Sequence, residues 1–309
     1  MQGGHAAGRR VTGSSSVDLR AEASTGILLS LAAYALFTLM DSTIKVLGGR
    51  YHVVQVVFFN ALFAFATVTL IALLRGRLGG MRSPQWRLHL LRWAIGLPGG
   101  LAIFWAYPRM PLADVYAILF AAPLFMTALS VPLLGERVGW RRWSAVLVGF
   151  LGVLIMLRPG SGLFGAAALA ALFGAVVHAC NMLLLRRMRG VDPPEVFGIW
   201  GNGLTLLATA LALPWLWRTP SPGDLALHAF AGIVAGSGFL LLVVAHARAP
   251  VSVLAPFQYS QMIYGIVLGV LLFGDLPRPA TMVGAAVVVA SGLYIFHREA
   301  VRRREVGSS

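Results

Sequence analysis

Ionisable and amide side chains interrupt several long apolar stretches of this 309-residue chain. Such groups are costly inside a bilayer, where they are usually paired or face a water-filled cavity. Asp41 and Lys45 are four residues apart, which places both on one face of a helix. His178 can gain or lose a proton near neutral pH. The chemistry that these residues offer is therefore hydrogen bonding and proton transfer.

The candidate binding residues are polar or aromatic side chains within these stretches. We predict that a small organic molecule contacts Asp41, Lys45, Trp105, Tyr116, His178, Asn181, Gln258, Gln261 and Tyr264. Gln258, Gln261 and Tyr264 fall near one helical face, which favours a shared wall. The candidates for carrying a coupling proton are, in order, Asp41, Asp114 and His178.

Structural roles are the alternative for several of these residues. An ion pair at a helix end, with Lys45 reaching toward the interface, is the alternative for Asp41 and Lys45. A hydrogen bond between helices is the alternative for His178. Trp105 stands close to the end of its apolar stretch, where an interfacial position is the alternative to stacking on a substrate.

The composition excludes a water-soluble globular domain. Apolar residues make up 58% of the chain and charged residues 12%, against about 25% charge in a typical soluble domain. Cys180 is the single cysteine, which excludes a disulfide scaffold and a cysteine-rich metal site. The net charge of +14 is typical of basic cytoplasmic loops, and no nucleic-acid motif accompanies it. We expect no metal and no cofactor.

Ten apolar stretches are each long enough to cross a bilayer as a helix. They cover residues 26–47, 53–74, 88–107, 112–134, 140–157, 163–185, 195–216, 225–245, 251–273 and 279–297. Their polar residues lack the alternation of an outer-membrane barrel, so each stretch is predicted to be a helix. The predicted fold is an all-α integral membrane protein, with a disordered tail over residues 1–25 and a basic tail over residues 298–309, both cytoplasmic.

The arginines predict the orientation of the ten helices. An even number of crossings places both tails on one side, and that side holds 19 of the 24 arginines. Because cytoplasmic loops are rich in arginine and lysine, both termini are expected in the cytoplasm. The expected location is the bacterial inner membrane.

The chain contains an internal repeat at an offset of 139 residues. Residues 109–136 align without a gap on residues 248–275, with the same R-x-P start and a closing G-[DE]. The two units, residues 26–158 and 163–297, each contain five predicted helices. An odd number of helices inserts two tandem copies in opposite orientations, and inverted repeats with a site between them are typical of transporters.

The segment Ala122–Gly160 resembles the EamA domain of the drug/metabolite transporter superfamily. It reads P-L-F, then L-G-E-R, a tryptophan and G-x-x-G-V, which is the typical ending of that domain. The second copy departs from the pattern with Met262 in place of Pro123. The resemblance implies ten helices in two EamA units and a carrier of small metabolites. Members of this family export amino acids or drugs, or import vitamins or S-adenosylmethionine.

The expected function is secondary transport of a small organic metabolite, such as an amino acid, a drug-like compound or a vitamin- or nucleoside-like compound, by alternating access. The alternative is a membrane-embedded enzyme acting on a lipid-linked substrate, but the chain lacks the metalloprotease, hydrolase-elbow and phosphate-loop motifs. Expected partners are the substrate, membrane lipids and protons, with no nucleic acid. A monomer or weak dimer is expected. The substrate, the direction of transport and the mode of coupling stay open.

Overall fold

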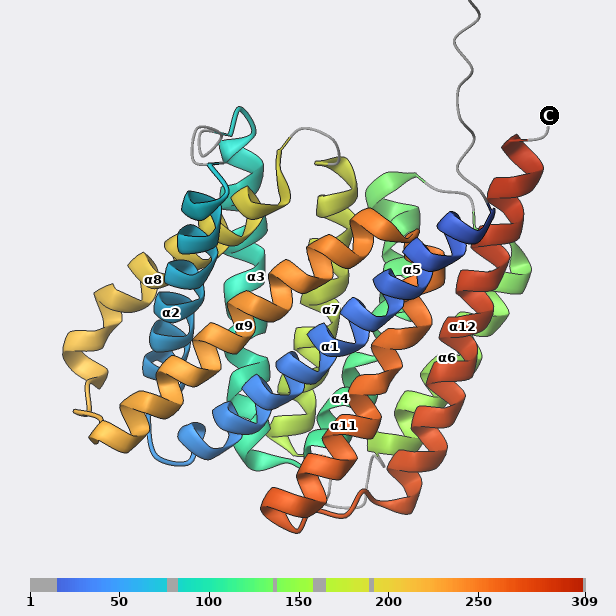
Figure 1. The fold of residues 1–309 in the computed structure, drawn as a ribbon. Coiled ribbons are helices and arrows are strands. Elements are labelled where there is room, and N and C mark those ends of the chain that lie inside the picture. Colours follow the sequence, from blue (N-terminus) through green and yellow to red (C-terminus); the bar gives the residue numbers. More distant parts are fainter. Residues whose placement is uncertain (1–15, 77–82, 136–137, 158–164, 189–191, 308–309) are drawn as a thin grey trace, which may run out of the picture.

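The computed structural model describes residues 16–76, 83–135, 138–157, 165–188 and 192–307 (Figure 1). Their regular secondary structure is helical, and no strand occurs among them. The α-helices are α1 (Ser16–Gly48), α2 (Val53–Leu74), α3 (Trp86–Ala106), α4 (Leu112–Leu119), α5 (Ala122–Leu134), α6 (Trp140–Leu157), α7 (Ala166–Arg187), α8 (Pro194–Leu216), α9 (Pro222–Arg248), α10 (Val251–Leu254), α11 (Ser260–Leu268) and α12 (Pro279–Gly307). Short 3-10 and π segments are η2 (Tyr107–Arg109), η3 (Ala255–Tyr259) and η4 (Gly269–Phe273).

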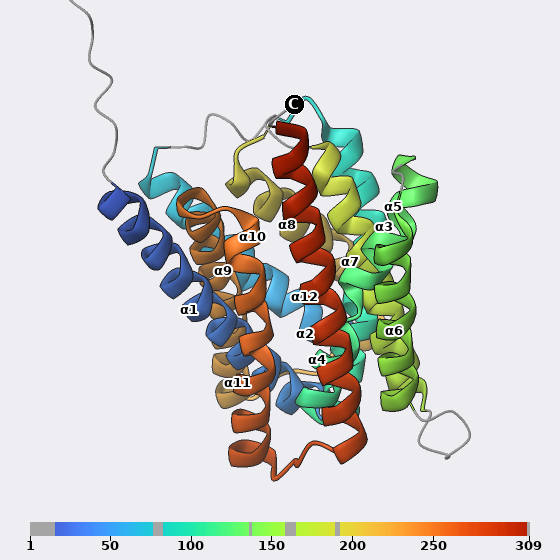
Figure 2. The same cartoon turned by 90° about the vertical axis from the view of Figure 1, so that its right-hand side faces the viewer.

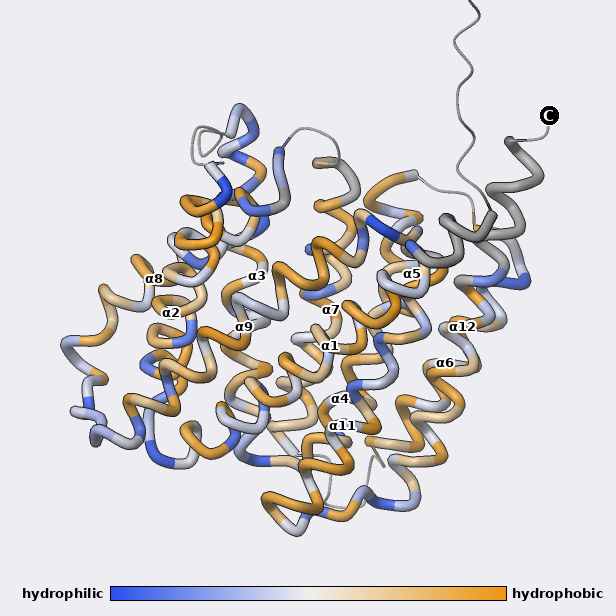
Figure 3. The backbone as a smooth tube through the Cα atoms, viewed as in Figure 1, coloured by the Kyte–Doolittle hydropathy of each residue, from blue (hydrophilic) through white to orange (hydrophobic). Residues whose placement is uncertain are grey.

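The predicted all-helical membrane fold is confirmed. Within the described residues, nine segments are long and apolar enough to cross a membrane, and Pro279–Ile295 is a shorter apolar helix at the tenth predicted stretch. Figure 3 shows the apolar colouring along the helices and the polar colouring at their ends. The first described residues of α1 and the end of α12 lie at the same end of the bundle (Figures 1 and 2). We call this the termini end, and the other the opposite end.

The helices extend further than the apolar stretches at both termini. Helix α1 begins at Ser16, so residues 16–25 continue the first helix where a disordered tail was predicted. Helix α12 continues to Gly307, well beyond the predicted end of the tenth stretch. Both extensions are rich in alanine, glutamate and arginine, which favour a helix outside the apolar region. Residues 1–15 and 308–309 of the predicted tails lie outside the described part of the chain.

The internal repeat is visible in the backbone. Pro111 and Pro250 each accept the first hydrogen bonds of the helix that follows, from residues three and four positions later. Gly135 and Gly274 each end the unit with a φ of +67°, a left-handed conformation that favours glycine. Both crossing segments are broken in the middle, at residues 120–121 and at residues 255–259. The repeat therefore includes the start, the break and the end of these helices.

The packing of helices follows the symmetry of the repeat. Helix α1 packs along α9, and their repeat mates α7 and α3 also pack along each other. Two pairs of mates pack directly, α2 on α8 and α6 on α12. Helices α6 and α12 run in opposite directions (Figure 2). This arrangement is that of two inverted halves that share one bundle.

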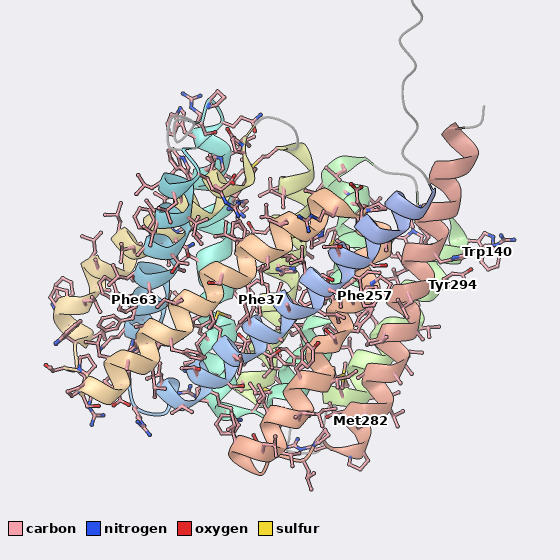
Figure 4. All side chains as sticks on the ribbon, in the orientation of Figure 1. Phe37, Phe63, Trp140, Phe257, Met282 and Tyr294 are labelled. Atoms are coloured by element: carbon pink, nitrogen blue, oxygen red, sulfur yellow. The ribbon has the colours of Figure 1, made fainter. Side chains whose placement is uncertain are left out.

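Small residues allow the closest contacts of α9. Gly232 and Gly236 lie against the backbone of α2, where an added Cβ would meet Phe63 or Thr67. Gly238 lies against Phe37 of α1, which Figure 4 labels together with Phe63. Close approach at glycine is typical of helices in membranes, where van der Waals contact drives packing. Helix α9 is thereby held against α1 and α2 as one unit.

Candidate functional site

His178 faces the interior of the bundle and yet is exposed. The exposed apolar residues of α7, Leu169 (46%) and Phe173 (48%), mark the face that points to lipid. His178 lies about 180° around the helix from Leu169 and about 140° from Phe173. Its neighbours on the inner face, Gly174 and Ala171, are buried. An exposed side chain between buried neighbours indicates accessible space inside the bundle, near the middle of α7.

The inner face of α7 continues to Asn181. Its side-chain amide lies over Gly96 of α3, where an added Cβ would come within 2.9 Å of Nδ2. Two turns away, Gly174 lies against Ile103 and the carbonyl of Gly99. His178 therefore lies beside the contact between α7 and α3, and Asn181 is half-buried at its edge.

Helix α11 has an apolar outer face and a polar inner one. Ile263 of α11 (64%) and Leu271 of the following η4 (73%) are exposed, whereas Gly265 is buried against the ring of Tyr116. Gln261 lies about 160° around the helix from Ile263 and is half-buried. Gln258 is half-buried in the 3-10 segment η3, which holds no buried residue. The two glutamines are therefore partly accessible near the middle of the crossing segment.

The aromatic residues of the same segment are also half-buried. Tyr264 follows Ile263 by one residue and lies at the side of α11. The ring of Tyr259 packs edge-on against Phe120 of the broken first-repeat helix, with centroids 4.9 Å apart. Its hydroxyl is buried, points toward Gly292 of α12 and has no hydrogen-bond partner. A ligand hydroxyl or a water molecule would satisfy that group.

Asp41 and Tyr116 form a buried pair closer to the opposite end. The Tyr116 hydroxyl donates to Asp41 Oδ2 over 2.7 Å, and both residues are almost fully buried. The hydroxyl of Tyr107 also hydrogen-bonds to Asp41. These bonds connect α1 to α4 and to the turn that precedes it. The carboxylate thus has protein partners.

Lys45, one turn beyond Asp41, contacts residues of both repeats. Its Nζ lies 2.8 Å from Asp275 Oδ2 and 2.5 Å from the carbonyl oxygen of Met110. The same ammonium group lies 5.1 Å from the ring centroid of Phe273. Lys45 therefore forms its ion pair with Asp275, and not with Asp41 as in the structural alternative considered for the two residues. Asp114 lies in the same region and hydrogen-bonds to Thr281.

Trp105 is placed at the opposite end, beside a cavity of about 240 Å³. Arg109 stands over its ring, 4.0 Å from the centroid, and donates to the carbonyl oxygen of Trp105. The cavity is also lined by the turn between α1 and α2. One face of this ring is therefore covered by Arg109.

The predicted site residues separate into two layers. The middle layer is half-buried or exposed and consists of His178, Asn181, Gln258, Gln261 and Tyr264. The outer layer lies toward the opposite end, is almost fully enclosed, and consists of Asp41, Lys45, Asp114 and Tyr116. The structure connects the members of the outer layer by hydrogen bonds or charge. The two layers have different surroundings and therefore suit different tasks.

Three further residues contact the outer layer and were not among the predicted site residues. Tyr107 stands at the end of an apolar stretch, Met110 contributes only its carbonyl oxygen, and Asp275 lies in a turn. The available signal was the repeat, because Asp275 occupies the acidic position of the closing G-[DE] pair. No spacing pattern pairs Asp275 with Lys45, which is 230 positions earlier.

Two further polar clusters connect neighbouring elements near the helix ends. Asp224 of α9 accepts hydrogen bonds from Arg50 and Tyr51 in the turn after α1. The bond to this carboxylate raises the pKa of Tyr51, since a charged acceptor favours the protonated phenol. His89 of α3 lies 3.0 Å from Asp192, at the other end of the bundle. These clusters brace the helices outside the two layers.

Inverted halves, broken helices and an accessible polar layer at mid-depth define a polytopic secondary transporter. Broken helices in matching positions of the two halves are the expected location of its binding site. The family model of the EamA-like transporter family matches residues 24–158 and again residues 165–296. The chain belongs to this family and contains two copies of its domain. It is a multi-pass membrane protein that transports small metabolites.

The curated relatives are bacterial transporters. A riboflavin transporter of Rhizobium johnstonii is 30% identical over 233 residues, covering 74% of this chain and 76% of the relative. A riboflavin transporter of Vibrio cholerae is 29% identical over 288 residues, covering 90% and 95%. An S-adenosylmethionine uptake transporter of Rickettsia prowazekii is 23% identical over 274 residues, covering 89% and 93%. These relatives are transporters and not enzymes.

A solved crystal structure shares the fold. It superposes with a TM-score of 0.62 at 21% sequence identity, covering 91% of this chain and 99% of the other. At that identity the likeness concerns the fold alone.

Proposed function

We propose that the chain carries an uncharged, flat, hydrogen-bonding metabolite, with riboflavin as the first compound to test. Transport would proceed by alternating access of the middle layer to the two sides of the membrane. The observation that carries this proposal is the exposed His178 on the inner face of α7, at the depth where the matching helices are broken.

The charges of the site favour an uncharged substrate. A charged molecule at mid-depth needs a compensating charge, because an unpaired charge in a low-dielectric environment is costly. The five candidates of the middle layer include no carboxylate, ammonium or guanidinium group. Asp41 and Lys45, which carry charges nearby, are engaged with Tyr116 and Asp275. Histidine, amide and phenol groups suit a neutral ring system with several donors and acceptors.

The relatives favour the same choice. Two of them are named riboflavin transporters, and riboflavin is a neutral tricyclic ring with a hydroxyl-rich side chain. Others are named S-adenosylmethionine uptake transporters, whose substrate carries a positive sulfonium centre. For this chain a sulfonium would have to lie beside neutral groups, which is the less favourable arrangement.

A counterflow assay in proteoliposomes tests the proposal. Liposomes loaded with unlabelled riboflavin should accumulate labelled riboflavin, and loading with S-adenosylmethionine should leave that uptake at background. A His178→Ala protein of normal yield is the matched control and should show reduced accumulation. Exchange of S-adenosylmethionine without exchange of riboflavin would contradict the proposed substrate class.

The inner membrane and cytoplasmic termini form part of the same proposal. The excess of arginine on one side supports this orientation, as does the position of both described ends of the chain at one end of the bundle (Figure 1). A phosphatase fused after Ser309 should be inactive, and a fluorescent protein at the same place should fluoresce. An active phosphatase fusion would reverse the orientation.

The protein is proposed to act as a monomer or weak dimer.

Protons are the proposed coupling ion. Asp41 remains the first candidate for the proton, because it is enclosed and two tyrosine hydroxyls bond to it. Asp114 and His178 follow. Asp41→Asn should abolish uptake driven by a pH gradient while counterflow continues in part. Unchanged gradient-driven uptake would exclude Asp41 as the proton carrier.

A further inference from the structure

The connection between Lys45 and Asp275 crosses from one repeat to the other. Lys45 lies in the last turn of α1, in the first repeat, whereas Asp275 lies in the turn before α12, in the second. The same ammonium group holds the carbonyl oxygen of Met110, in the turn before α4. One side chain thus joins three segments from both halves at the opposite end of the bundle.

The layer beneath this connection is closed. Ile44 and Leu47 of α1 are fully buried, as is Leu112 of α4. They belong to one apolar cluster that also contains Tyr107 and Tyr116. A metabolite in the middle layer therefore has no open route past the outer layer in this conformation.

Other charged groups surround the Lys45 ammonium group. Asp114 and Arg278 lie close enough to interact electrostatically with each other, and Asp114 also with Lys45 and Asp275. Two carboxylates and two cations therefore share the region. The side chains of Lys45 and Asp275 are 11% and 29% exposed, so water can reach the pair and replace each partner when the pair separates.

At the termini end, α1 makes a contact of a different kind. There Ala245 of α9 and Ala249, which follows α9, pack with Leu254 of α10 and with Ile27 of α1 in an apolar cluster. Near that end His89 lies 3.0 Å from Asp192, and neither residue belongs to α1 or α11. The ion pair that ties α1 to the end of the broken second-repeat helix is thus found at the opposite end.

From this geometry we propose that Lys45 and Asp275, with Asp114 beside them, form the gate at the opposite end of the bundle. The gate is closed here, and it opens when Lys45 separates from Asp275 and Met110. The proposal rests on the proposed function, because the gate controls access to the middle layer, where the substrate is proposed to bind. Lys45 is accordingly a gating residue and not a substrate ligand.

Cysteine accessibility tests the gate without any substrate. In a Cys180→Ala background, His178→Cys places a single thiol in the middle layer. A membrane-impermeant thiol reagent added from the opposite end should label it slowly. Lys45→Ala or Asp275→Asn should raise that rate about tenfold, as expected when an open state of a few per cent becomes a large fraction. The exchanged pair Lys45→Asp with Asp275→Lys should return the rate toward the starting value.

Arg50→Ala provides the matched control. Its ion pair with Asp224 lies at the same end but joins the turn after α1 to α9, which already packs along α1. This variant should leave the labelling rate unchanged. Equal labelling of Arg50→Ala and Lys45→Ala would indicate general loosening and overturn the gate, as would unchanged rates in both Lys45→Ala and Asp275→Asn.

The outcomes separate the gate from the site. A thiol at position 178 that is labelled from neither side would contradict the accessible middle layer, and with it the gate. Another outcome is a thiol that is labelled from the termini end while Lys45→Ala and Asp275→Asn leave the labelling rate from the opposite end unchanged. That result would contradict the gate alone. The identity of the transported compound affects neither result.

Discussion

The two broken helices of the repeat follow the same backbone path but differ in burial. Both begin after a proline, break in the middle and end at a glycine with a φ of +67°. Every residue from Leu112 to Ile118 in α4 is buried. In the second copy, no residue of Ala255–Tyr259 is buried, and Gly265 is the buried residue of α11.

The difference follows from the inversion of the repeats. Helix α4 lies at the opposite end, where the outer layer closes the bundle, whereas α10 and η3 lie toward the termini end. When an inverted-repeat carrier is closed at one end and open at the other, its two copies have different surroundings. Duplication therefore accounts for the shared backbone path. The different surroundings account for the burial, so the first copy is a buried scaffold and the second is a half-buried wall.

The largest expected effect is on the buried copy. Tyr116→Ala removes a buried ring and one of the two tyrosine hydroxyls that bond to Asp41, so we expect a loss of about 3–5 kcal/mol of stability. Thermal unfolding of the purified protein in detergent measures this loss. The matched change Tyr264→Ala, at a half-buried position in the second copy, should lower the midpoint much less. Equal losses would remove the contrast between scaffold and wall.

A change at the contact between the two copies should lower the stability nearly as much. Gly265 lies against the ring of Tyr116, so a Cβ added there would collide with it. Gly265→Ala should cost about 1–3 kcal/mol through overpacking. Gly100→Ala is the control, since nothing lies within 4 Å of a Cβ at that position. Similar unfolding midpoints for the two variants would contradict the contact.

Substitutions in the more exposed second copy should weaken substrate binding and leave the stability almost unchanged. Gln258→Ala and Gln261→Ala each remove one hydrogen-bonding group, which should weaken riboflavin binding by about 1–3 kcal/mol, or roughly 5- to 150-fold. The unfolding midpoint should stay close to that of the natural chain. Equilibrium binding to the purified protein measures the affinity. If both variants bind with unchanged affinity, η3 and α11 do not line the site.

The smallest effect should be the same in both copies. Gly135→Ala and Gly274→Ala place a Cβ on a left-handed residue in open space, and each should cost about 1 kcal/mol. Expression should fall more than affinity. Asparagine at either position should be milder, because it tolerates this conformation better than alanine does. Unequal costs would show that the two turns, although alike in backbone, are held differently.

Much of the fold could be predicted from the residues. The stretches 53–74, 112–134 and 140–157 match the observed crossing segments residue for residue, because the change from apolar to polar side chains is abrupt at their ends. The repeat was also visible, since the prolines and glycines that begin and end its helices are required by backbone conformation. The breaks within two of these helices were not predicted.

The membrane fold, the inverted halves and the set of polar side chains at depth could all be predicted from the order of residues along the chain. Hydrophobicity and backbone chemistry act over short distances along the chain and can therefore be read directly. The pairing of Asp41 with Tyr116, the pairing of Lys45 with Asp275 and the exposure of His178 inside the bundle became apparent from the three-dimensional packing of the helices. The partners and the exposure of a side chain depend on helices that are far apart in the chain. The same type of side chain can therefore bind a substrate or form a structural ion pair, depending on the surface packed against it.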